Sequence, residues 1–248
     1  LFTNLVKREY NKNGTLIRCL MDENKPIDSA RDKPTTLDSA RTIMGPNFIS
    51  LEEAATVFPC DFSDLLQLQS IPYSKGLLYQ LSEPECPFVL VPGIPFVHRG
   101  KTRPLTIATM RDIFSNTPGL FAETIEFYQP DYQFIHNHIC LPQWYLLSKN
   151  PKNLPDVRKL LINMEMFQGD YVIERAVVYI YSWLLFYNLR KESIFTGDWV
   201  ITGDDFSPHV PTNHACLFFN ENKISMCRWS KRYDWKPGIA PFIKHDLT

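Results

Sequence analysis

The chain has 248 residues, of which 44% are hydrophobic and 21% are charged, enough apolar material for one large folded domain or two small ones. Its 26 basic and 27 acidic residues give a formal net charge of −1. A nearly neutral chain has no global field that attracts polyanions or anionic membranes, so nucleic-acid binding would have to come from a local patch.

The cysteines are too scattered to suggest a disulfide scaffold. No C-x-x-C pair occurs among the six: Cys19, Cys60, Cys86, Cys140, Cys216 and Cys227. This spacing favours reduced thiols. The first residues lack the continuous apolar segment of a signal peptide, and no anchor is expected further along. We therefore expect a soluble cytoplasmic protein with no membrane partner.

Residues 1–42 are expected to form a hairpin or a helix followed by a polar arm. Asn13-Gly14 suits the positive φ angles of a tight hairpin turn, and Gly14 as the end of a first helix is the equally favoured alternative. Residues 21–41 are polar and predict a surface linker. Residues 43–248 are expected to form a single compact domain.

Several helices are predicted in the first half of this domain. Ser50-Leu51-Glu52-Glu53 is a capping box, which predicts a helix from there to about Phe58. Further helices are predicted across Ser63–Gln69, after Tyr73 and over Thr106–Phe114. The apolar run Pro84–His98 contains four prolines and predicts an edge strand or a buried extended segment.

The second half contains the strongest structural signal. After an irregular aromatic region at 118–155, a helix is predicted at Val157–Phe167, with Asp170 as N-cap of the next. That next segment, Val177–Leu189, is apolar on every helical face and contains five aromatic residues. Its thirteen residues are fewer than the roughly 20 that span a bilayer, so the pattern predicts a helix buried in a protein core.

Strands are predicted after this helix, at Ile194–Thr202, Ala215–Phe219 and Lys223–Trp229. A helix followed by an antiparallel meander indicates the α+β class. We expect a central buried helix packed on an antiparallel sheet formed by the C-terminal third of the chain.

Several short segments resemble a group of uncharacterised bacterial proteins. They are Arg41-Thr42-Ile43-Met44-Gly45-Pro46-Asn47-Phe48, Glu52-Glu53-Ala54, Ile71-Pro72-Tyr73-Ser74 and Val177 through Phe195. This resemblance implies no reaction, cofactor or catalytic residue.

The first candidate site is the connection at 203–214, which gathers Asp204, Asp205, His209 and His214. Carboxylates and neutral imidazoles share divalent metal ions, and a long loop is often functional. The alternative, which we favour, is a turn at Gly203-Asp204-Asp205 with solvated histidines.

The second candidate is the segment Ile135-His136-Asn137-His138-Ile139-Cys140-Leu141-Pro142, which loosely resembles the His-Asn-His nuclease family. The resemblance implies that His138 is the general base and that His136 is a metal ligand beside a scissile phosphate. The usual glycine pair and zinc-binding cysteine pairs are missing, and a structural role for both histidines is the favoured alternative.

The third candidate is a basic and aromatic segment at 228–236, a composition typical of surfaces that bind single-stranded nucleic acid. In such surfaces cations contact phosphates and aromatic rings stack on bases. Its residues are Arg228, Trp229, Lys231, Arg232, Tyr233, Trp235 and Lys236. The alternative is a terminal strand whose aromatic residues pack inward while its cations face water.

No P-loop, Rossmann glycine fingerprint or Gly-x-Ser-x-Gly elbow occurs in the sequence. We therefore expect a soluble, non-catalytic binding or interaction protein whose partner is a protein or a nucleic acid. The enzyme alternative is a phosphodiester hydrolase that uses a divalent metal ion as cofactor.

Overall fold

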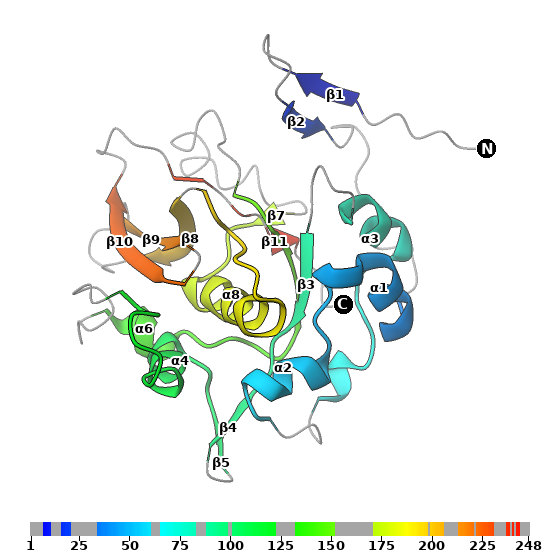
Figure 1. Cartoon of the computed structure of the whole chain (residues 1–248). Coiled ribbons are helices and arrows are strands. Elements are labelled where there is room, and N and C mark those ends of the chain that lie inside the picture. The colour runs from blue at the N-terminus through cyan, green and yellow to red at the C-terminus, as the bar shows by residue number, and fades with distance from the viewer. Residues whose placement is uncertain are drawn as a thin grey trace.

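The computed structural model, drawn in Figure 1, describes residues 7–10, 16–20, 34–60, 65–82, 88–98, 101–122, 132–151, 171–197, 199–205, 213–220, 222–230, 237–238, 240 and 242–243. The fold belongs to the α+β class, as the sequence predicts. Helix α8 (Ala176–Arg190) lies at the centre of the view, with strands on both sides and shorter helices around it.

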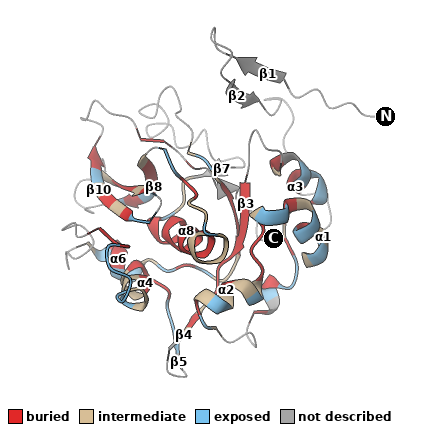
Figure 2. Cartoon of the chain, in the orientation of Figure 1, coloured by how far each residue is buried: buried red, intermediate tan, exposed pale blue. Residues whose placement is uncertain are grey.

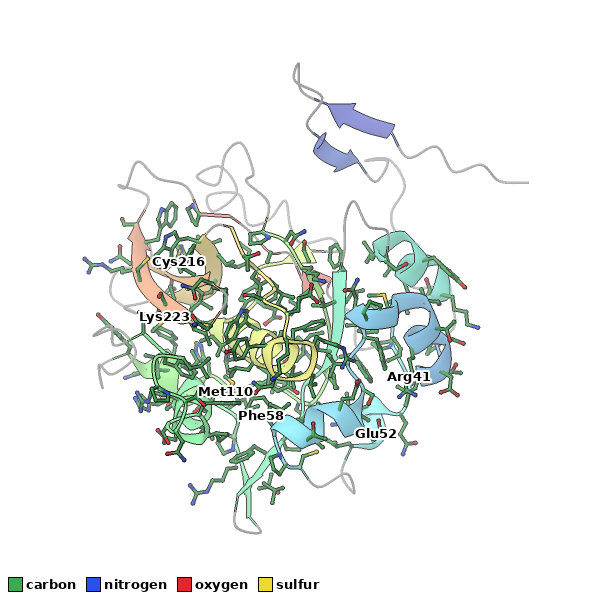
Figure 3. All side chains as sticks on the ribbon, in the orientation of Figure 1. Arg41, Glu52, Phe58, Met110, Cys216 and Lys223 are labelled. Carbon is green, nitrogen blue, oxygen red and sulfur yellow. The ribbon has the colours of Figure 1, made fainter. Side chains whose placement is uncertain are left out.

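Helix α8 confirms the prediction of a buried central rod. Every residue from Ala176 to Phe186 is buried, and Figure 2 shows this part of the helix in the buried colour. Phe58 and Met110, labelled in Figure 3, lie close below it, and the rings of Phe58 and Tyr181 are 5.2 Å apart. A helix that is apolar all round is stable only when other elements cover every face, and here they do.

The antiparallel meander of the C-terminal third forms one wall of this core. Strands β8 (Trp199–Asp205), β9 (Asn213–Phe219) and β10 (Ile224–Ser230) pair in the order β10-β9-β8. Alternate residues point to opposite faces of a strand. Ala215, Leu217 and Phe219 accordingly join the core around α8, whereas Cys216 joins a small cluster with Ile201 and Trp229.

A second sheet lies on another side of α8 and is tied to it by tyrosine hydroxyl groups. Its strand order is β3-β6-β11-β7, formed by Phe88–Pro92, Trp144–Ser148, Phe242–Ile243 and Tyr171–Val172. Tyr181 donates a hydrogen bond to the Pro92 carbonyl at 2.5 Å, and Tyr179 donates one to the Ala240 carbonyl at 2.7 Å. These bonds satisfy phenol groups that are otherwise enclosed by apolar side chains.

The short helices around the core begin at side-chain caps. In α2 (Leu51–Val57), Ser50 and Glu53 form the predicted capping box, with hydrogen bonds of 3.2 and 2.9 Å. Helices α3 (Lys75–Leu81) and α4 (Ile107–Ile113) begin after Ser74 and Thr106, whose hydroxyl groups accept backbone hydrogen bonds. The predicted helix at Ser63–Gln69 is reduced to a 3₁₀ turn, η2 (Leu66–Leu68), in the described part of that range.

The N-terminal part differs from its prediction at one end. Strands β1 (Lys7–Tyr10) and β2 (Leu16–Leu20) form an antiparallel hairpin, one of the two alternatives that the sequence left open. The predicted linker was wrong for residues 37–41, which begin helix α1 (Leu37–Met44). Thr36 caps this helix, and Ala40 and Met44 are buried in the core. The expected boundary between residues 42 and 43 therefore falls inside a core helix.

The region expected to be irregular contains regular structure. Helix α6 (Gln133–Asn137) and β6 lie there, and β6 is an inner strand of its sheet, paired with both β3 and β11. Strand β3 is an edge strand, as its prolines predict, and β4 (Phe96–His98) forms a small ribbon with β5 (Lys101–Arg103). A 3₁₀ turn, η1 (Gly45–Asn47), follows α1. The helix expected at Val157–Phe167 lies outside the described residues.

Within the described ranges, no helix is long and apolar enough to cross a membrane.

Candidate acid–base site at the start of helix α8

The site begins with an irregularity in strand β8. Ile201 pairs with Cys216 and Asp205 pairs with His214, so β8 places three residues, 202–204, opposite the single residue Ala215. A bulge of this kind bends a strand and re-aims its side chains, and bulges are common next to active sites. Here it directs Asp204 toward the beginning of α8.

Hydrogen bonds hold the bulge in place. The Thr202 hydroxyl group donates to the Ala215 carbonyl at 3.0 Å, and the Gly203 amide donates to the Glu174 carbonyl at 2.8 Å. A Cβ atom on Gly203 would lie 3.0 Å from the Ile173 carbonyl oxygen. Glycine therefore allows β8 to approach the segment that leads into α8 more closely than any other residue would.

Asp204 supplies the cap that α8 lacks in its own sequence. The N-cap residue is Arg175, whose side chain makes no capping hydrogen bond, and the expected cap Asp170 lies outside the described residues. Instead, Oδ2 of Asp204 accepts a hydrogen bond from the Ala176 amide at 2.6 Å. A carboxylate is favoured at this end of a helix because unpaired amides and the helix dipole give it a partial positive charge. The predicted N-cap was therefore wrong.

The other oxygen of the same carboxylate contacts an imidazole. Oδ1 of Asp204 is paired with Nδ1 of His138, which lies 66 residues earlier in the chain. The Asp204 side chain is fully buried, whereas the His138 side chain keeps 31% of its surface exposed. A carboxylate only accepts hydrogen bonds, so Nδ1 is the donor and Nε2 is left as the ring nitrogen available to other groups.

His138 is held by a well-anchored segment. His138 is the C-cap of α6, and its amide donates to the Phe134 carbonyl in the first turn of that helix. The Cys140 amide donates to the Leu105 carbonyl at 3.0 Å. The Leu141 amide donates to the Tyr145 hydroxyl group at 3.0 Å. These contacts fix the backbone on both sides of Cys140, so the orientation of the imidazole is set by the fold as well as by Asp204.

The neighbouring ionisable groups are shifted toward their neutral forms. Burial raises the pKa of the Glu174 carboxyl group, and nearby Asp204 adds to this shift, against hydrogen bonding and charge from Arg175. Burial also raises the pKa of the Cys140 thiol. A thiol held in its neutral form is a poor nucleophile.

The metal-binding hypothesis requires Asp204, Asp205, His209 and His214 to lie together, but the two aspartates point to opposite faces of the strand. Consecutive strand residues point to opposite faces, and Asp204 is buried while Asp205 is exposed. Asp205 pairs with His214 across the sheet, with Oδ1 3.2 Å from Nδ1. The two carboxylates therefore belong to separate pairs. His209 lies outside the described residues.

His136, the other expected ligand, is exposed in the last turn of α6. Over the part of the chain that the structure describes, no three histidine, cysteine, aspartate or glutamate side chains are grouped as a metal site requires. His138 and Asp204, which belong to different candidate sites in the sequence, lie in direct contact.

The basic and aromatic segment is described only at its beginning. Arg228 is exposed on β10, but Trp229 is only 1% exposed and packs with Ile201 and Cys216. A buried indole offers no face to a base, so Trp229 follows the packing alternative. The remaining candidates in this segment, Lys231, Arg232, Tyr233, Trp235 and Lys236, lie outside the described residues.

Two contributors to the site were missed in the sequence: the Ala176 amide and Glu174. The first is a backbone group, and sequence patterns do not show where an unpaired helix amide will find its acceptor. A local signal was present in Gly203, since an isolated glycine inside a strand pattern indicates a bulge or a close backbone approach.

Comparison with known proteins gives no relative from which a role could be transferred: the chain has no significant match to a protein-family model, a curated protein or a solved structure.

Proposed function

We propose that this chain is a hydrolase in which His138, oriented by Asp204, removes a proton from the water molecule that attacks a phosphodiester. Nε2 of His138 is the base, and the Asp204 carboxylate stabilises the imidazolium that forms. As the water oxygen bonds to phosphorus, the bond from phosphorus to one ester oxygen breaks, and the imidazolium returns the proton to that departing oxygen. General-base catalysis of this type contributes about 10²- to 10⁴-fold to a rate.

The pairing of a fully buried carboxylate with a partly exposed imidazole is the observation that supports this proposal. A histidine that only contacts solvent needs no buried partner. Burying a carboxylate costs free energy unless its oxygens accept hydrogen bonds. Here one oxygen is satisfied by a helix amide and the other by the imidazole. The strand irregularity that brings Asp204 there is the kind of feature found next to active sites.

An anionic substrate suits the surroundings of this pair. The exposed Arg175 immediately precedes Ala176, whose amide binds Asp204, and offers a positive charge to an anion. Ile139 and Leu141 expose 37% and 48% of their surface in the segment that carries His138. These side chains offer apolar contact to the organic part of a diester.

The test is hydrolysis of bis(p-nitrophenyl) phosphate by the full chain, with p-nitrophenyl acetate in a parallel series. We expect turnover of the phosphodiester to fall at least about 100-fold in His138→Ala and in Asp204→Asn. His136→Ala and Asp205→Asn are matched controls. Each changes a histidine or an aspartate that is close in sequence to His138 or Asp204 but does not belong to the His138–Asp204 pair, and we expect both variants to retain activity.

Two outcomes would contradict the proposal: no turnover by the unmodified chain, or unchanged turnover in His138→Ala. Preferential hydrolysis of the acetate would reassign the substrate to carboxylic esters. Repeating the series with EDTA separates direct acid–base catalysis from catalysis that is assisted by a divalent metal ion.

The second candidate function is binding without catalysis, and a groove between α1 and α3 favours it. The groove has a volume of about 230 Å³ and is lined by Asp38, Ser39, Thr42, Ile43, Lys75 and Tyr79. Tyr79, one of these lining residues, exposes 61% of its surface. Absence of turnover together with a ligand whose affinity falls in Tyr79→Ala would support this function instead.

A further inference from the structure

Two cysteines that are eleven positions apart in the sequence meet across the C-terminal sheet. Cys216 on β9 is paired in register with Cys227 on β10. Figure 3 labels Cys216 within this sheet, next to β10. Residues directly opposite one another on antiparallel strands point to the same face, with Cα atoms about 4.5–5.5 Å apart. This spacing lies within the range of about 4.4–6.8 Å that a disulfide bridges.

The surroundings of the two side chains are asymmetric. Cys216 is fully buried in a cluster with Ile201 and Trp229, and Cys227 packs against the same cluster but is only partly buried. The side chain of Cys227 is therefore the one that a reagent in solution reaches first. Cys216 then lies beside it, already ordered by the sheet, as the second sulfur.

We propose that Cys216 and Cys227 are a redox pair that forms a cross-strand disulfide when the protein meets a low-molecular-weight disulfide such as oxidised glutathione. The Cys227 thiolate attacks one sulfur of the reagent and releases one thiolate, leaving a mixed disulfide. The Cys216 thiolate then attacks the Cys227 sulfur and releases the second. The two protein thiols are oxidised, the reagent is reduced to two thiols, and these take up the two protons.

This modification is independent of the proposed hydrolase. The cysteines lie on the face of the sheet that carries Asp205 and His214, because Cys216 and His214 are two residues apart on β9. The other face carries the core residues that pack around α8. Formation of the disulfide and loss of hydrolase activity are therefore separate results.

The chain is well suited to a direct test, because trypsin cleaves between the two cysteines. After exposure to oxidised glutathione and blocking of remaining thiols with N-ethylmaleimide, an unreduced digest separates Cys216 and Cys227 into peptides 192–223 and 224–228. We expect these peptides to be recovered as one species joined through sulfur, and to separate when a reductant is added.

Two variants identify the order of the steps. In Cys216→Ser, we expect the mixed disulfide with glutathione to accumulate on Cys227. Cys60→Ser is the control elsewhere in the fold, and we expect the Cys216–Cys227 disulfide to form in it as in the unmodified chain. We also expect the oxidised protein to unfold at a higher temperature than the reduced protein, since the bond restricts the unfolded chain.

The result that would overturn the proposal is recovery of both peptides from the unmodified chain as N-ethylmaleimide adducts under these conditions. A disulfide that joins Cys216 or Cys227 to a different cysteine would overturn it equally.

Discussion

The two ends of helix α8 are both held by charged side chains, but in different surroundings. At the C-terminal end, Arg190 pairs with Glu53 at 2.6 Å and Lys149 pairs with Glu192 at 2.5 Å, with all four side chains partly exposed. At the N-terminal end, the Asp204 carboxylate is fully buried. Both arrangements interact favourably with the helix dipole, because Arg190 and Lys149 are cations near its negative C-terminal end and Asp204 is an anion at its positive N-terminal end.

The difference indicates which end serves only the fold. Ion pairs near the surface typically contribute about 0–1 kcal/mol and involve groups that stay charged at neutral pH. The N-terminal pair instead joins a buried carboxylate to an imidazole, the side chain that gains and loses a proton in the physiological range. The C-terminal end therefore anchors the helix, whereas the N-terminal end also presents the imidazole that we propose as the general base.

The largest expected effect on stability comes from removing the buried carboxylate. Asp204→Ala leaves the Ala176 amide and the His138 imidazole without their acceptor, and we expect the free energy of unfolding to fall by about 3 kcal/mol. Urea denaturation measures this change. Asp205→Ala is the matched control, since the Asp205 side chain is 44% exposed, and a loss of equal size in this variant would contradict the distinction between the pairs.

A smaller effect is expected from filling the close approach at the bulge. In Gly203→Ala, the added Cβ lies 3.0 Å from the Ile173 carbonyl oxygen, so β8 or the segment before α8 must shift by a few tenths of an ångström. We expect a loss of about 1–2 kcal/mol in unfolding free energy together with reduced turnover, because Asp204 moves with the strand. Unchanged turnover in a destabilised variant would show that the bulge serves packing alone.

The smallest effect is expected at the C-terminal end. Arg190→Ala removes the partner of Glu53, and we expect a loss of about 1 kcal/mol and no change in turnover. Urea denaturation and the phosphodiester assay measure the two quantities. A fall in turnover would contradict the assignment of this end to the fold alone.

The contribution of the Arg190–Glu53 pair to stability depends on pH. Burial acts to raise the pKa of Glu53, but hydrogen bonds from the Ser50 amide and Arg190, with the Arg190 charge, outweigh it and lower the pKa below 4.5. Stability from a carboxyl group with a depressed pKa is present above the unfolded-state pKa and is lost as the pH falls through the folded-state pKa. The stability difference between the unmodified chain and Arg190→Ala should therefore shrink in acid. A difference that grew would contradict the pairing.

Local signals allowed much of the fold to be predicted. The capping box at Ser50 lies within one turn of the helix that it starts, and the apolar rod of α8 needs no partner to be recognised. Strand β6 was missed because its neighbours β3 and β11 lie far away in the sequence, and pairing with them is what makes it an inner strand. Helix α1 was missed because its buried residues, Ala40 and Met44, are few in a polar segment.

The candidate site could be predicted only in part, for a similar reason. Asp204 and His138 were each identified, but 66 residues separate them and a strand bulge decides which aspartate faces the histidine. Strand alternation predicts that Ile201 and Asp205 share one face of the sheet, as observed. Alternation alone does not predict that the Asp204 carboxylate reaches the first amide of α8. That direction depends on Gly203 and on hydrogen bonds to the segment before the helix.

Whether Asp204 orients His138 is tested by the protonation pattern of the His138 ring, measured by ¹⁵N NMR of histidine-labelled protein, with His138→Ala to assign the signals. At neutral pH we expect a proton on Nδ1 and an unprotonated Nε2, a pattern that Asp204→Asn abolishes. A neutral ring with its proton on Nε2, or ring shifts that are identical in the unmodified chain and Asp204→Asn, would contradict the claim that Asp204 orients His138.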